Sequence, residues 1–509
     1  MQKRRFACAV FVSCALCVSG ASISIAGRIF GPAVDADVGP TQPCTQLTSL
    51  KLPDVRITEA VAVPAATTGA IRAPHCRVTG VVGSEIHFRL LLPDTWNGKF
   101  LMGGGGGFVG AIDNQAQRTV DAGYATVGTD TGHRGEGTDA SWALDNVERQ
   151  VNFGHLAVHR TAEVAKAVVR AYFGSDATRN YFVGCSNGGR QALMEAQRYP
   201  GDFDGIVAGA PALDFVAIGA QFIKDSQAVF PDLDNPTPLF TGDTLKSIEA
   251  QIVDKCDAID GLEDGLMEDP RRCSVDVTTL AGLTDVQRAA LKKVYGETRG
   301  KDGVIYPAQP FGGEGTAGGW PAWIIGGAPE PPLKGRSLRL IFGTQFFKYF
   351  VFGNPSWDYT KYDVSNALKD GRLVGTFLNA TNPDLDAFKS SGHKLLMWHG
   401  WSDPALSALA TINYYDQVQA RDASLREYFR MFMMPGVLHC GAGPGPDTVD
   451  WASIIADWVE KGKAPDRIVV RKLGPGGVVT RSRPLCPYPQ HAVYDGSGNA
   501  DAEESFTCR

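Results

Sequence analysis

The chain has 509 residues, of which 44% are hydrophobic, and a formal net charge of −6. This length allows one large domain with an insertion, or two domains. The acidic balance and the scattered basic residues provide no basic surface for nucleic acid, so we expect a small uncharged or weakly acidic ligand as the partner.

The N-terminus predicts an export signal. An apolar run at residues 6–25 follows Lys3, Arg4 and Arg5 and ends in small residues. This pattern is typical of a cleaved secretory leader, which we place at residues 1–26. Serines, cysteines and a glycine interrupt the run and disfavour the alternative of a membrane anchor. We therefore expect a secreted or periplasmic protein.

The cysteines predict disulfide bonds. Removing the three cysteines of the leader leaves eight of the eleven in the mature chain, and an even number in an exported protein indicates four disulfides. Eight cysteines allow 105 pairings, which the sequence does not decide. Short spacing favours three local pairs, Cys44–Cys76, Cys256–Cys273 and Cys486–Cys508, and leaves Cys185 and Cys440.

The next part of the chain alternates between strand and helix patterns. Apolar alternation predicts strands at residues 85–93, 98–106 and 124–130. Residues 155–174 have helical spacing, and a strand at 180–184 leads into a helix at 189–198. This order is typical of a parallel sheet with helices outside it.

The stretch Gly-Cys-Ser-Asn-Gly at residues 184–188 fits the G-x-S-x-G pattern between a strand and a helix. Its glycines permit the strained turn that lifts a serine oxygen into a cleft. The pattern also arises by chance as an ordinary glycine turn. Its position favours Ser186 as a nucleophile, which needs a histidine base and a carboxylate to orient that base.

Residues 213–381 are rich in glycine, proline and aromatic residues and lack strand–helix alternation. We predict an inserted lid domain here, between core segments 27–212 and 382–509. Its aromatic stretches, 318–327 and 344–353, offer flat apolar walls for an aromatic acyl group, or are simply the core of the lid.

An acidic loop within the lid spaces Asp257, Asp260 and Asp264 between glycines. Carboxylates in tight turns, together with backbone carbonyls, can converge on a hard cation. The spacing is not that of an EF-hand, and acidic loops are often only solvated. The residues alone leave both interpretations open.

After the lid, we predict strands at 393–400 and 427–436 and helices at 407–420 and 449–461. Asp403 follows the first strand and His439 follows the second, so the order is Ser, Asp, His, as in α/β-hydrolases. Three other histidines compete with His439 but have simple structural interpretations: His133, His393 and His399.

The two remaining cysteines adjoin candidate catalytic residues. Cys185 precedes Ser186, and Cys440 follows His439. A disulfide between them would tie the turn of the nucleophile to the loop of the base. The rival hypothesis, that Cys185 is itself the nucleophile, needs a reduced thiol with a lowered pKa in an exported protein.

These motifs resemble the tannase and feruloyl esterase family over nearly the whole mature chain. The resemblance rests on the stretches GCSNGGRQ, DGIVAGAPA, HGWSDPALS, MPGVLHCGAGPG and RPLCPYPQ. It implies an α/β fold, the α/β-hydrolase fold with a large inserted lid domain, and a serine carboxylesterase. By resemblance, Ser186 is the nucleophile, His439 is the general base and then acid, and Asp403 orients His439.

The family also implies an oxyanion hole and a lid calcium. The oxyanion donors match the amides of Asn187 and Gly105, with Gly104 as the fallback because five glycines leave the register ambiguous. The calcium matches the side chains of three aspartates and two carbonyls: Asp257, Asp260, Asp264, Leu262 and Leu266. We expect this Ca²⁺ to be structural, with no metal in the chemistry and no organic cofactor.

The family further indicates the substrate pocket. Trp323 matches a substrate-facing tryptophan of family members that hydrolyse terephthalate monoesters, whereas Leu406 stands where those have an aromatic residue. Their lid arginine is matched unambiguously by neither Arg336 nor Arg339. We therefore expect esters of phenolic acids, such as feruloyl or galloyl esters. The alternatives are a terephthalate monoester hydrolase, a thiol-dependent hydrolase, and a non-catalytic exported phenolic-binding protein.

Overall fold

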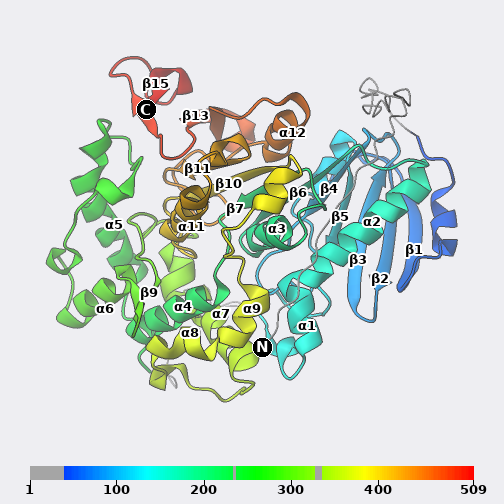
Figure 1. The fold of residues 1–509 in the computed structure, drawn as a ribbon. Helices are drawn as coiled ribbons and strands as arrows, with labels where there is room; N and C mark the ends of the chain where they lie inside the picture. Colours follow the sequence, from blue (N-terminus) through cyan, green and yellow to red (C-terminus); the bar gives the residue numbers. More distant parts are fainter. Residues whose placement is uncertain (1–38, 233–236, 327–334) are drawn as a thin grey trace, which may run out of the picture. The chain divides into compact units, whose positions relative to one another are not determined.

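A nine-stranded sheet organises the computed structural model, which describes residues 39–232, 237–326 and 335–509 (Figure 1). The strand order is β1-β2-β3-β5-β4-β6-β7-β10-β11. The first three pairings are antiparallel and the remaining five are parallel. The strands are β1 Val55–Val63, β2 His75–Val82, β3 Ile86–Pro93, β4 Lys99–Gly103, β5 Ala125–Thr129, β6 Arg179–Cys185, β7 Gly205–Gly209, β10 Lys394–Gly400 and β11 Phe429–Met434.

Helices cover both faces of this sheet, because strand side chains alternate between the faces. In β4, Phe100 and Met102 join one hydrophobic core, which includes helices α2 (Ala157–Phe173), α3 (Asn187–Arg198) and α11 (Ala408–Arg421). Leu101 joins the core on the other face, where helix α12 (Trp451–Lys461) packs. Two-sided coverage leaves the central strands buried, so the site must form at their ends.

The predicted strands and helices of the two core segments are present, with ends shifted by a few residues. The strand predicted at 98–106 stops at Gly103, where the glycine run leaves the sheet. Three strands of the nine-stranded sheet were not predicted, β1, β2 and β7, and neither were the short paired strands near the C-terminus. β7 is fully buried on both faces, so its sequence lacks the alternation that marks a half-exposed strand.

The middle segment adds no described strand to the nine-stranded sheet. Its core takes in Phe108 and Phe153 from outside the segment. The described residues from 39 onward form one compact unit, so the lid as a separate domain stays a prediction. Its elements are α4 Phe215–Val229, α5 Gly242–Cys256, α6 Asp285–Tyr295, β8 Thr298–Gly300, β9 Gly303–Tyr306, α7 Leu338–Phe346, α8 Ala367–Asp370 and α9 Arg372–Leu378.

The remaining elements are short and peripheral. They are α1 Val147–Val151, α10 Asp386–Ser390, and the paired strands β12 Ile468–Leu473 with β13 Val479–Leu485 and β14 Ala492–Tyr494 with β15 Phe506–Cys508. No helix in the described part of the chain has the length and apolar character to cross a membrane. The predicted leader, residues 1–26, lies outside the described residues.

All eight cysteines of the predicted mature chain form disulfides, with Cα–Cα distances of 5.4 to 5.9 Å. The three local pairs favoured by spacing are present. The fourth joins Cys185 to Cys440 across 255 residues. Because Cys185 is bonded, it has no free thiol to act as a nucleophile.

Candidate active site

Ser186 occupies a strained turn between β6 and α3. Its φ of 64° lies in the left-handed region that non-glycine residues seldom adopt. The turn needs glycines on both sides: a Cβ on Gly184 would lie 2.4 Å from the oxygen of Gly188, and one on Gly189 would lie 2.3 Å from that of Gly209. Steric exclusion thus explains Gly184 of the motif and Gly189 directly after it, and the strain holds Ser186 at the end of its strand.

His439 lies between Ser186 and Asp403. Its Nε2 is 2.8 Å from the Ser186 Oγ, and its Nδ1 is 2.8 Å from the Asp403 Oδ2. Asp403 follows β10, and His439 lies in the loop after β11, so neighbouring parallel strands bring them together. The three predicted residues therefore form one continuous hydrogen-bonded chain.

Asp403 is completely buried and is surrounded by donors. Its Oδ1 accepts hydrogen bonds from the backbone N–H groups of Ala405 and Leu406, at 2.7 and 3.0 Å. Burial alone would raise the pKa of Asp403, but the charge of His439 and the hydrogen bonds from His399 and His439 hold it below the ordinary value. The group facing His439 is thus a carboxylate.

His399, one of the competing histidines, also contacts Asp403. Its Nε2 faces two acceptors, the Asp403 Oδ2 at 3.1 Å and the carbonyl of Leu406 at 3.2 Å, so we assign the ring proton to Nε2. Its Nδ1 is 2.7 Å from the hydroxyl of Thr411. Sequence reasoning missed this pairing, although the i, i+4 spacing of His399 and Asp403 is visible in the sequence.

The other two competing histidines lie elsewhere. His133 is buried against Trp142, with ring centroids 3.5 Å apart, and its Nε2 is 2.8 Å from the carbonyl of Phe108. Burial lowers the pKa of His133 to about 4, so it is neutral at pH 7. His393 contacts the carbonyl of Pro200 through Nδ1. Both have structural roles.

The N–H groups of the glycine loop differ in their hydrogen-bond partners. The N–H of Gly105 donates to the Oε1 of Gln191 at 3.0 Å, and that of the fallback, Gly104, donates to the carbonyl of Val183. Neither is a free donor. The N–H of Gly107 has no hydrogen-bond partner among the described residues, and Gly107 lines the cavity beside Ser186. The ambiguous register of five glycines concealed this difference.

An apolar cavity of about 340 Å³ opens beside Ser186 and His439. His439 is the one titratable side chain among the described residues that line it. The predicted pocket residues Trp323 and Leu406 both line the cavity, and the Trp323 ring meets His439 edge-on at 5.0 Å. The aromatic lining consists of Phe108, Phe215, Phe222, Trp323, Phe342 and Phe346.

Neither candidate lid arginine reaches this cavity. Arg339 is buried, forms an ion pair with Asp225 and donates to the carbonyl of Pro404 at 3.0 Å. Arg336 is exposed and does not line the cavity. The described part of the cavity wall thus lacks a cation to pair with an anionic acyl group.

Gln115 supports the turn of the nucleophile from the glycine-loop side. Its Oε1 accepts from the Cys185 N–H at 2.7 Å, and its Nε2 donates to the Cys185 carbonyl at 3.3 Å. Sequence analysis missed Gln115, which stands in no motif. The Cys185–Cys440 disulfide joins the same turn to the loop of His439.

Comparison with known proteins assigns the family. Residues 69–509 match the family described as "Tannase and feruloyl esterase". The chain belongs to the tannase and feruloyl esterase family. It is 33% identical to an uncharacterized esterase of Xanthomonas campestris pv. campestris, with 91% of each chain covered, and 32% identical to the mono(2-hydroxyethyl) terephthalate hydrolase of Piscinibacter sakaiensis, with 88% of this chain and 87% of that protein covered.

The fold agrees with that of this family. The crystal structure of feruloyl esterase B from Aspergillus oryzae superposes with a TM-score of 0.81 and 26% identity, covering 92% of this chain and 99% of that one. The predicted α/β-hydrolase fold is therefore confirmed. As a member of the tannase and feruloyl esterase family, the protein is a carboxylic ester hydrolase.

The acidic loop expected to bind calcium in this family has suitable donors. Asp260, Leu262, Asp264, Leu266 and Glu268 line one small cavity, which Arg483 also lines. The Asp257 and Asp260 carboxylates accept backbone N–H groups only. Oxygen donors of this kind fit Ca²⁺. Asp264, however, is paired with Arg483 at 2.5 Å, so a bound cation would compete with this arginine.

Proposed function

We propose that the protein is an exported serine esterase that hydrolyses esters of neutral phenolic acids, of the feruloyl or galloyl type. The observation that carries the proposal is the hydrogen-bonded chain from Asp403 through His439 to Ser186 at an apolar cavity. Export is supported by the predicted leader and by four disulfides, which persist in oxidising compartments.

The chemistry follows from the orientation of His439. The Ser186 Oγ attacks the ester carbonyl as the His439 Nε2 takes the hydroxyl proton, and the Asp403 carboxylate stabilises the imidazolium through Nδ1. His439 then protonates the leaving alcohol. A water molecule, deprotonated by His439, attacks the acyl-enzyme, and the acid leaves as the proton returns to Ser186.

Backbone donors are expected to stabilise the oxyanion that forms in both steps. The first is the N–H of Asn187 at the start of α3, which has no partner among the described residues. For the second, we propose Gly107 in place of Gly105. The support for Gly107 is its unpaired N–H at the cavity, whereas Gly105 is held by Gln191.

The cavity supports a neutral aromatic acyl group. Flat apolar rings suit an aromatic ring, and no cation among the described lining residues would pair with a second carboxylate. The relative from Piscinibacter sakaiensis keeps terephthalate monoesters as the second candidate substrate.

The decisive experiment measures hydrolysis of methyl ferulate, methyl gallate and mono(2-hydroxyethyl) terephthalate by the wild type and by Ser186→Ala. We expect turnover of a phenolic ester, a loss of roughly 10⁵-fold or more in kcat in the variant, and little turnover of the anionic terephthalate ester. Faster turnover of the terephthalate ester would favour the second candidate. Full activity in Ser186→Ala would refute the serine mechanism.

Two further outcomes test the remaining alternatives. A wild type that binds phenolic esters without turning them over would support a non-catalytic binding protein. Activation by mild reduction would support a thiol mechanism, whereas the disulfide between Cys185 and Cys440 leads us to expect inactivation.

We also propose that Asp257, Asp260 and Asp264, with the carbonyls of Leu262 and Leu266, hold a structural Ca²⁺ when it is available. The ion would neutralise the carboxylates of this loop and would take no part in the chemistry. Chelation with EGTA should lower the Tm by several degrees and added Ca²⁺ should restore it, because a ligand that binds the native state stabilises it. If the Tm of Asp257→Asn responds to EGTA and Ca²⁺ as that of the wild type does, calcium binds elsewhere in the protein.

A further inference from the structure

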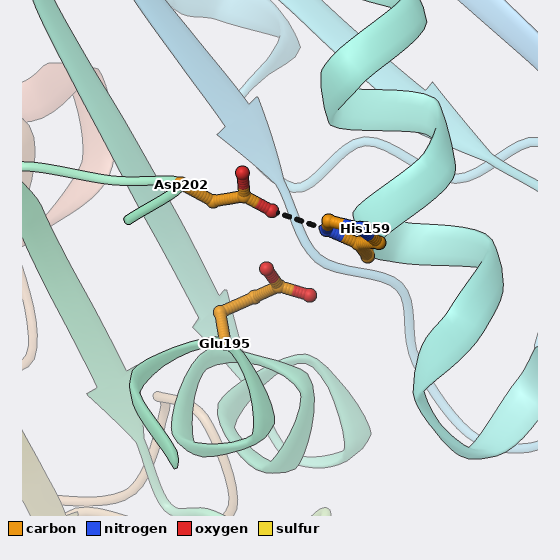
Figure 2. A group of neighbouring side chains, drawn as sticks. All are labelled: His159, Glu195 and Asp202. Atoms are coloured by element: carbon orange, nitrogen blue, oxygen red, sulfur yellow. Dashed lines mark hydrogen bonds and ion pairs between the residues drawn. The ribbon is translucent and has the colours of Figure 1, made fainter. Parts of the chain in front are cut away.

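A second cluster of ligand-type side chains lies away from the esterase site. His159 on α2, Glu195 on α3 and Asp202 after α3 converge (Figure 2), and each offers one ligand atom within 4.8 Å of the others. Within the described part of the chain, no other group of three histidine, cysteine or acidic residues meets this distance. Glu195 lies on α3, nine residues beyond Ser186, which caps the start of that helix, so the two are roughly 13 Å apart along the helix axis.

Glu195 has an unusual environment for a carboxylate. Its side chain is completely buried, and neither of its oxygens has a hydrogen-bond partner. Figure 2 shows the carboxyl group directed into the space between His159 and Asp202. A buried acceptor without a donor is costly, so the site requires either a proton on Glu195 or a cation beside it.

The surroundings of His159 resemble the outer shell of a metal ligand. Its Nδ1 faces the Asp202 Oδ2 at 2.6 Å, while its Nε2 lies 3.6 Å from the Glu163 carboxylate. The Tyr199 ring stacks on the imidazole at 3.8 Å and an angle of 4°, which fixes its plane. Metal-binding histidines commonly present their second nitrogen to a carboxylate in this way.

Asp202 is similarly oriented. Its Oδ1 accepts from the Lys166 ammonium at 3.2 Å, which leaves Oδ2 to face the cluster. Lys166 also donates to the Asp202 carbonyl at 3.1 Å, so the ammonium is held on the far oxygen of the carboxylate. The positive charge of Lys166 would repel a bound cation, but the carboxylates of Glu195 and Asp202 offset that charge.

We propose that His159, Glu195 and Asp202 bind a divalent first-row transition metal of the Zn²⁺ class, with water completing the coordination. One imidazole nitrogen and two carboxylates suit Zn²⁺ or Co²⁺ better than Ca²⁺, which prefers six to eight oxygens. Binding releases two protons to solvent: the one that His159 shares with Asp202, and the one that Glu195 carries in the metal-free site. The ion would join α2 to α3 and to the segment leading into β7.

The competing interpretation is that Glu195 is a neutral acid and no metal binds. Burial and the nearby Asp202 raise its pKa well above the ordinary value, so a protonated Glu195 is chemically consistent. The two interpretations differ in one measurable quantity, which is metal affinity.

The test uses untagged, full-length protein that is stripped with EDTA, returned to excess Ca²⁺ and titrated with Co²⁺, with Zn²⁺ as competitor. We expect about one Co²⁺ per chain with visible absorption of a low-symmetry site, and a loss of at least a hundredfold in affinity in Glu195→Gln and in His159→Gln. Glu163→Gln should weaken binding by about tenfold through the outer shell. Asp176→Asn, an exposed acidic site near the end of α2, is the matched control and should bind like the wild type.

Two results would overturn the proposal: a wild type that binds neither Co²⁺ nor Zn²⁺, or ligand variants, Glu195→Gln and His159→Gln, that bind as the wild type does. Retained esterase activity and circular dichroism identify folded variants, because none of these residues contacts the Ser186 site. If Glu195→Gln does not fold, the partly exposed His159→Gln carries the test alone.

Discussion

His399 and His439 contact the same oxygen of Asp403, so a single carboxylate serves two imidazoles. A carboxylate that accepts hydrogen bonds from more donors is a weaker base toward each of these donors. His399 is therefore a positioning residue, because it acts on His439 through Asp403 and lies outside the lining of the cavity.

Replacing His399 with alanine should change the pH dependence of the reaction. Loss of its N–H raises the pKa of Asp403 and strengthens the hold of the carboxylate on the protonated His439. The acidic limb of the kcat/KM profile should then move to higher pH by about half a unit to one unit. His399→Gln, which keeps an N–H donor at this position, is the control and should move the limb less. If His399→Ala has reduced activity at every pH but an unchanged pH profile of kcat/KM, His399 has only a packing role.

At the scale of secondary-structure elements, the sequence predicts those elements whose residue types are fixed by local steric requirements. β6, the Ser186 turn and α3 are predictable because the glycines at 184 and 189 are sterically required there. β7 is not, because both its faces are buried. Gln115 and Gln191 reach the site through contacts distant in sequence, which no local pattern encodes. His399 stands only four residues before Asp403, but this spacing alone does not indicate a shared carboxylate.

The disulfide between the Ser186 turn and the His439 loop should matter more to activity than a peripheral one. In Cys185→Ala/Cys440→Ala, we expect kcat to fall roughly 10- to 100-fold, because small displacements of Ser186 from His439 are costly, and the free energy of unfolding to fall by about 2 to 5 kcal/mol. The matched control is Cys486→Ala/Cys508→Ala, which removes a disulfide remote from the cavity. Equal losses of kcat in both variants would contradict a specific role in the site.

At the scale of the whole molecule, buried acids couple stability to pH. Glu314 is completely buried, and its Oε1 accepts from the Tyr295 hydroxyl and from the Gly312 N–H. Burial raises the pKa of Glu314 to about 7. Between its ordinary value and pH 7, the folded state thus keeps a proton that the unfolded state has lost, so stability falls as pH rises through this range.

Glu314→Gln should remove this contribution. Relative to the wild type, the variant should gain roughly 3 kcal/mol in the free energy of unfolding between pH 4.5 and pH 7, and the difference should be flat above and below this range. Denaturant unfolding at a series of pH values measures it. The comparison with the wild type isolates Glu314, because His133 and His155, whose pKa values are lowered to about 4, act in the opposite direction in both proteins. A pH-independent difference would show that Glu314 ionises normally.

The Cys185–Cys440 bond also imposes an order on biosynthesis. Cys185 leaves the ribosome 255 residues before its partner, which at ordinary rates of synthesis is about ten to fifty seconds earlier. Cys256 and Cys273 emerge during that interval. If the chain enters an oxidising compartment as it is made, Cys185 meets these two incorrect partners, in addition to the earlier Cys44 and Cys76, before the correct one exists. The yield of active enzyme should therefore depend on a disulfide isomerase as well as on an oxidant.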